Sequence, residues 1–233
     1  MSVLLSTLRS MWLRIAISLS LSMIVATPAE AAETEKSLAI IDTGFDTTIP
    51  IIGGAVIHEV CILDWYACPN GAGFQEGLGS ATLPQTVTRF SGAGHGTQMA
   101  SIAVITNPQI KLVLVRLIAY SERGQRLSVF DSTVTKAFRW IFENRERFNI
   151  GAVAMAQGHH GLLQQRNYCP KSLELEKLFV QLRHSDIPVF LPTGNAGDKS
   201  RIDWPACIPA AMAIGAVSPV SYTHLTLPTK RIV

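Results

Sequence analysis

Three short motifs in this chain carry side chains that could act together in acid–base chemistry. Asp42 follows an apolar run and precedes Thr43-Gly44, a position from which a carboxylate can orient a second side chain. His95 lies within residues 94–100 (GHGTQMA) with a glycine on each side, and histidine is the usual general base near neutral pH. Asn195 lies within residues 193–197 (TGNAG), and its amide could donate a hydrogen bond to an oxyanion.

Each motif taken alone also has an ordinary structural interpretation. Asp42 could cap a helix or a turn, and Asn195 could occupy a tight turn. His95 could bond the backbone where a helix starts. Asp-Thr-Gly also occurs in aspartic proteases, where two aspartates share one proton. That interpretation needs a second such motif or a dimer of short chains, and the sequence holds no second Asp-Thr-Gly or Asp-Ser-Gly.

The segments between the motifs predict alternating strands and helices. Apolar runs indicate strands at residues 36–42, 53–60, 110–118, 152–156, 188–192 and 211–217, and helical spacing indicates helices at 96–105, 131–148 and 172–184. Residues 64–94 are rich in Gly, Pro, Asn and Ser and indicate a long loop. This order predicts an α/β fold, a three-layer parallel sheet with helices on both faces. Active sites in such sheets lie at the carboxyl ends of the strands, where the three motifs fall.

In this order and with these flanks, the motifs resemble those of the subtilisin-like serine peptidases (subtilases, peptidase S8). Residues 154–158 (AMAQG) are similar to the family strand that lines the S1 pocket, and residues 204–217 to an aromatic-Pro-Ala to Val-Gly-Ala stretch. The resemblance covers roughly residues 37–218 and implies a subtilisin-like fold. It also implies that Ala156, Gln157 and Gly158 bind substrate, with the peptide adding as a strand beside them.

The resemblance implies a role for each motif. Asp42 would hold the tautomer of His95 and stabilise its charged form, and His95 would take a serine proton and return it to the leaving amine. Asn195 would donate a hydrogen bond to the tetrahedral oxyanion. The implied function is a serine endopeptidase that hydrolyses peptide bonds in polypeptides.

The serine nucleophile of that family has no counterpart in this sequence. Ser200, Ser218 and Ser221 follow Asn195, but none lies in a Gly-Thr-Ser-Met-Ala motif. We therefore expect the chain to be truncated before the catalytic serine, C-terminally incomplete as a fold, and inactive as written. The alternative is a non-catalytic secreted pseudoprotease that binds peptides.

The two ends of the chain do not look like parts of this domain. Residues 1–31 resemble a secretory signal peptide, because Arg9 and Arg14 precede a short apolar run, 15–25, and an A-x-A site ends at Ala31. An uncleaved anchor is the alternative, although the run is shorter than the roughly 20 apolar residues that span a bilayer. We expect residues 32–219 to be a partial peptidase domain of a secreted or periplasmic protein. Residues 220–233 resemble a translated adapter used in sequencing libraries, and we expect them to be non-native; a genuine strand-like tail is the alternative.

Four cysteines form an even set in a chain expected to be exported, so disulfides are the default. Of the three possible pairings we favour Cys61 with Cys68, which closes a short loop, and Cys169 with Cys207, which ties distant segments together. A zinc site is the competing interpretation, but no C-x2-C or H-x3-H spacing is present.

Charge and composition limit the other partners. The net charge is +3, yet residues 32–219 hold equal numbers of basic and acidic residues, so neither nucleic acid nor a membrane surface is a predicted partner. Adjacent His159 and His160 have no carboxylate cluster beside them, and we predict no metal site. The resemblance implies no cofactor for catalysis and allows a structural calcium ion without pointing to its ligands.

Overall fold

The computed structural model describes residues 35–64, 67–88, 92–121, 123–127, 129–158, 169, 172–195 and 202–216. The chain divides into two units, Met1–Thr34 and Glu35–Val233, and every described residue belongs to the second. The predicted signal peptide (1–31) and the predicted non-native tail (220–233) lie outside the described residues, as do His159 and His160.

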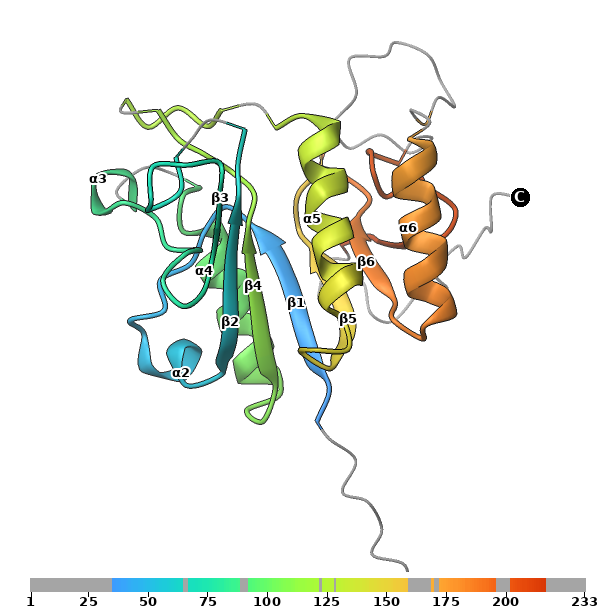
Figure 1. Ribbon diagram of the computed structural model, residues 1–233, viewed down its shortest axis with the longest axis horizontal. Helices are drawn as coiled ribbons and strands as arrows, with labels where there is room; N and C mark the ends of the chain where they lie inside the picture. The colour runs from blue at the N-terminus through green and yellow to red at the C-terminus, as the bar shows by residue number, and fades with distance from the viewer. Residues whose placement is uncertain are drawn as a thin grey trace, which may run out of the picture. The chain divides into compact units, whose positions relative to one another are not determined.

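One seven-stranded sheet forms the middle of the described unit. Its strands are β1 (Ser37–Asp42), β2 (Val56–Ile62), β3 (Phe74–Glu76), β4 (Lys111–Arg116), β5 (Ile150–Met155), β6 (Val189–Pro192) and β7 (Met212–Ile214). Their order is β3-β2-β4-β1-β5-β6-β7, and Figure 1 shows β1 between β4 and β5. All neighbouring pairs are parallel except β2 with β3. The predicted parallel sheet is confirmed, and the antiparallel β3 is an addition from the segment predicted as a loop.

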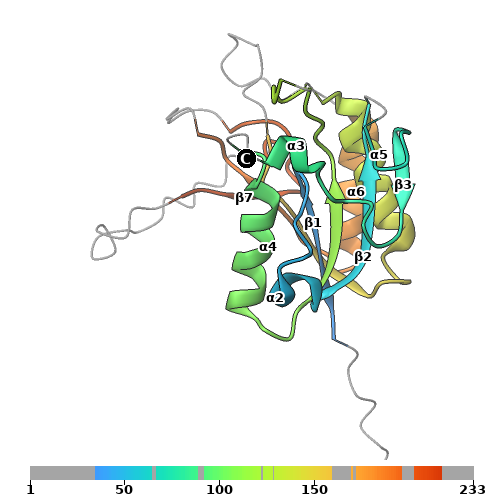
Figure 2. The ribbon, with the colours of Figure 1, turned by 90° about the vertical axis from the view of Figure 1, so that its left-hand side faces the viewer.

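Helices cover both faces of this sheet. They are α2 (Pro50–Gly53), α3 (Gln85–Thr88), α4 (His95–Thr106), α5 (Asp131–Asn144) and α6 (Leu173–His184). Figure 2 shows α4 on one side of the strands and α5 and α6 on the other. The three-layer α/β fold predicted from the sequence is therefore confirmed.

Side-chain alternation in the strands explains the two layers of the core. Successive residues of a strand point to opposite faces. In β1, Ile40 packs with α4 residues such as Ala100, whereas Ile41 packs in the cluster that contains Phe138 of α5 and Phe179 of α6. A strand buried on both faces must be apolar at nearly every position, which is why the continuous apolar runs predicted these strands.

Helix α5 is shorter than the predicted helix over 131–148. It ends at Asn144, and the chain turns through Asn149, whose φ is 47°, before β5 begins at Ile150. The amide of Ile150 donates to the carbonyl of Arg145 at 2.8 Å. This turn moves the start of β5 two residues ahead of the predicted strand at 152–156.

Candidate active site

Asp42 is the last residue of β1 and His95 is the first residue of α4. Their side chains meet: His95 Nδ1 lies 2.9 Å from each carboxylate oxygen of Asp42. The Asp42 side chain is completely buried, and about a third of the His95 side chain is exposed. The fold thus brings together two of the three motif residues, 53 positions apart in the sequence.

Three donors converge on the buried carboxylate of Asp42. Besides His95, the backbone amide of Thr43 donates to Asp42 Oδ1 at 2.6 Å, and the side-chain amide of Gln157 donates to the same oxygen at 2.8 Å. A buried carboxylate is costly unless hydrogen bonds replace its water shell. These donors fix both the position and the orientation of Asp42.

The hydroxyl of Thr43 joins the end of β1 to the start of α4. It donates to the carbonyl of Ala93 at 2.9 Å and accepts from the amide of Gly96 at 3.1 Å. A Cβ atom at Gly96 would lie 2.5 Å from the carbonyl oxygen of Gly44 and 3.1 Å from Asp42 Cβ. Only glycine therefore allows this close approach, which sets the distance between Asp42 and His95.

A buried arginine, Arg116, lies beside Asp42 on the neighbouring strand β4 and holds the loop that contains Thr82. Arg116 pairs with Asp42 in the β1–β4 register, and its guanidinium donates to the carbonyls of Thr82 (2.8 Å) and Ile118 (3.3 Å). Burial lowers the pKa of Arg116 to about 10. The loop held in this way places Leu83 against Gly44.

The electrostatics favour a charged His95. The hydrogen bond to Asp42 raises the pKa of His95 above its usual value of 6.5, while partial burial and the nearby positive charge of Arg126 lower it less. Ionised Asp42 can only accept, so Nδ1 must carry the proton of this bond. Nε2 is then the nitrogen available to take a proton from a reacting group.

Arg126 belongs to a hairpin beside the Asp42–His95 pair. The sequence did not predict this hairpin. Tyr120 and Arg126 form a bridge, and Leu127 N donates to the carbonyl of Ala119 at 3.0 Å. The phenol of Tyr120 donates to the carbonyl of Gly92 at 3.2 Å. Residues 121–126 (SERGQR) are polar or glycine throughout, so no period-two pattern marked the hairpin in the sequence.

The predicted substrate-binding residues follow β5, next to β1. Ala156 is half-buried, Gly158 is exposed and Gln157 is buried. The Gln157 side chain points to Asp42 instead of to an open surface. Alternation along β5 would place Gln157 on the face of Met155, but the strand ends at Met155, so the pattern gives no guidance beyond it.

Asn195 lies three residues after β6 and is exposed. Among the described residues it forms no hydrogen bond with Asp42 or His95. Its predicted role as an oxyanion donor stays a prediction.

Both favoured disulfides are present. Cys61 is bonded to Cys68 and Cys169 to Cys207, with Cα–Cα distances of 5.9 and 5.8 Å. The first joins β2 to the segment that follows it, and the second ties Cys169 to the region before β7. The pairing predicted from the sequence is confirmed.

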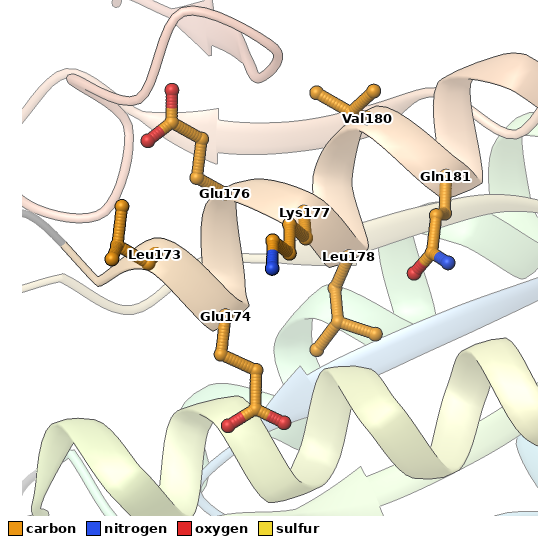
Figure 3. A pocket seen from close by; sticks show the side chains of 7 residues that line it. All are labelled: Leu173, Glu174, Glu176, Lys177, Leu178, Val180 and Gln181. Atoms are coloured by element: carbon orange, nitrogen blue, oxygen red, sulfur yellow. The ribbon is translucent and has the colours of Figure 1, made fainter.

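The described residues offer neither a metal-binding cluster nor a membrane-spanning helix. No group of three or more His, Cys, Asp or Glu side chains there could hold a metal ion, and no helix in the described ranges is long and apolar enough to cross a bilayer. An open groove runs beside α6 and is lined by seven of its residues between Leu173 and Gln181 (Figure 3). Because α6 covers the opposite face of the sheet from α4, this groove is separate from the Asp42–His95 pair.

No family model matches the chain. The chain is 30% identical over 137 residues to the subtilisin-like protease het-Q2 of Podospora anserina. The aligned segment covers 58% of this chain and 34% of that protein. Among solved structures, Sphericase aligns with a TM-score of 0.51 at 16% identity, over 76% of this chain and 53% of its own.

A cold-adapted subtilisin-like serine proteinase aligns over 78% of this chain and 55% of its own, with a TM-score of 0.47 and 17% identity. The chain thus spans about a third of the curated relative and about half of these solved structures. It is similar in sequence to a subtilisin-like protease and has the subtilisin-like α/β fold.

Proposed function

We propose that this chain supplies the aspartate, Asp42, and the histidine, His95, of an Asp-His-Ser triad in a secreted or periplasmic subtilisin-like serine endopeptidase. The observation that supports this most is the buried Asp42 carboxylate on Nδ1 of a partly exposed His95. The similarity to a subtilisin-like protease agrees with it. The nucleophilic serine would come from residues outside those that the structure describes.

His95 would take a proton from the serine and then give it to the leaving group, with Asp42 as its partner. His95 Nε2 takes the proton from the serine hydroxyl as Oγ bonds to the scissile carbonyl carbon, and Asp42 stabilises the resulting imidazolium. His95 then gives that proton to the leaving amine nitrogen while the C–N bond breaks, leaving an acyl-enzyme. A water molecule then gives a proton to His95 as its oxygen bonds to the acyl carbon. The ester bond to Oγ breaks, and His95 returns that proton to Oγ, which releases the acid product and restores the serine.

The substrate would be an extended polypeptide. Its backbone would pair beside residues 156–158, which follow β5 at the carboxyl edge of the sheet, in the manner of an added strand. Asn195 would donate to the oxyanion formed on the scissile carbonyl. The mechanism requires no cofactor, and a calcium ion would have a structural role only.

The first experiment is to sequence the locus through its 3′ end with primers outside any library adapter. A reading frame that continues past Ser218 into a Gly-Thr-Ser-Met-Ala motif supports the peptidase. The product of that frame should react with a fluorophosphonate, and Asp42→Asn should slow the labelling by about 10⁴-fold. If genomic DNA encodes residues 220–233 and then stops, or if the complete product does not label, the non-catalytic peptide-binding protein is the better assignment.

A further inference from the structure

Gln157 makes contacts that its expected role in substrate binding does not explain. Its side-chain nitrogen lies 2.8 Å from Asp42 Oδ1 and 3.1 Å from His95 Nδ1. Only 9% of the residue is exposed. Pairing with a peptide strand would use the backbone of Gln157, whereas its side-chain amide is enclosed with the two groups of the proposed triad.

The chemistry of the three groups fixes the direction of each hydrogen bond. An ionised carboxylate only accepts, so Gln157 must turn its NH2 group toward Asp42, since its carbonyl oxygen would be repelled at 2.8 Å. His95 Nδ1 also donates to Asp42. The contact between Gln157 and His95 therefore joins two donors that meet at one acceptor, Asp42 Oδ1, which also accepts from the backbone amide of Thr43.

We propose that Gln157 is a positioning residue that fixes the Asp42 carboxylate and competes with His95 for one of its oxygens. This inference rests on the proposed function, because it assigns Gln157 to the same acid–base pair. A donor on Asp42 withdraws part of the negative charge that His95 would otherwise feel. Gln157 thus opposes the rise in the His95 pKa that Asp42 causes, and keeps the imidazole easier to deprotonate.

Within the described part of the chain, the charged groups that shift the His95 pKa are Asp42 and Arg126. Asp42 faces His95 from β1 and raises its pKa, and Arg126 faces it from the hairpin and lowers it. Tyr120 lies near the same turn, and burial raises the pKa of its phenol. Gln157 is uncharged, so its effect can be separated from theirs by substitution at one position.

The test is an NMR titration of the His95 imidazole in the chain as it stands. The His95 signal is identified by its loss in His95→Gln. Gln157→Met keeps the length of the side chain without a donor, and Gln157→Asn keeps an amide that is too short to reach Asp42. We expect the His95 pKa to rise in both variants. The matched control Gln181→Met changes an exposed glutamine on α6 and should leave the pKa unchanged.

A second measurement uses the unaltered chain, in case the variants do not fold. The side-chain NH2 signals of Gln157 should lie away from free-amide shifts and should move with the same midpoint as His95. The inference is overturned if these signals are ordinary and do not titrate, or if folded Gln157→Met leaves the His95 pKa unchanged while Asp42→Asn lowers it. Neither readout requires peptidase activity, so an inactive complete product would refute the proposed function without deciding the role of Gln157.

Discussion

The two glycines that flank His95 provide a test of how the site is built. Gly96→Ala and Gly94→Ala each add one methyl group next to the same histidine. A Cβ atom at Gly96 would lie 2.5 Å from a backbone oxygen, that of Gly44, which cannot swing away as a side chain could. At Gly94 nothing lies within 4 Å of the added atom.

The expected change in stability for Gly96→Ala has the opposite sign to the change that helix propensity alone predicts. Alanine is favoured over glycine by up to about 1 kcal/mol inside a helix, so propensity predicts that Gly96→Ala stabilises. Overpacking costs about 1–3 kcal/mol, and moving α4 away also weakens the bond from Gly96 N to Thr43 Oγ1, worth about 1 kcal/mol. The net expectation for Gly96→Ala is a loss of about 1–3 kcal/mol.

The assay is denaturant unfolding of the two variants and the unaltered chain, followed by circular dichroism. Gly94 is the N-cap of α4, where alanine is a poorer residue than glycine, so Gly94→Ala should cost less than about 1 kcal/mol. A Gly96→Ala chain that is as stable as the unaltered one, or more stable, would refute the idea that glycine at this position sets the distance between α4 and β1.

Three further outcomes are expected. Replacing Cys169 and Cys207 together by serine should lower the unfolding free energy by about 4 kcal/mol, the entropy model's value for a 38-residue separation; a denaturant midpoint equal to that of the unaltered chain would contradict it. Arg126→Gln should raise the His95 pKa, because it removes a positive charge that lowers it, and an imidazole titration that stays in place or moves down would argue against that contact. Burial lowers the pKa of His58 below 6.5 in the folded chain. As the pH falls, His58 is therefore protonated in the unfolded chain before it is protonated in the folded one, and stability should fall from pH 6.5 down through the folded pKa. His58→Phe should lose less stability over that range in unfolding measured at a series of pH values, and an equal loss in both proteins would count against His58 as the cause.

Much of the fold could be predicted because the sheet is buried on both faces. Continuous apolar runs such as 110–118 leave little choice but a central parallel strand. The end of β1 and the start of α4 were also marked locally, by Asp-Thr-Gly and Gly-His-Gly. Since both ends lie at one edge of the sheet, the contact between Asp42 and His95 followed from the fold.

The features that were missed depend on long-range contacts. Strand β3 has one half-buried residue between two exposed ones and no apolar pattern; it forms because β2 offers a free edge, to which Gln75 pairs opposite Cys61. The direction of the Gln157 side chain depends on where β5 ends and on the buried carboxylate of Asp42, at the end of β1, which accepts its hydrogen bond. Neither strand β3 nor the direction of the Gln157 side chain could be predicted from the neighbouring residues in the sequence.

The place of β1 in the sheet has a consequence for how the chain folds. Of the described strands, the one made first is Ser37–Asp42, and it lies between two partners made much later, Lys111–Arg116 and Ile150–Met155. It cannot complete its ladders until both have been synthesised, and contacts so distant in sequence slow folding through the cost of closing long loops. During that interval an apolar strand is exposed without its partners, so this stage of synthesis is the one at which we expect the chain to be most prone to aggregation.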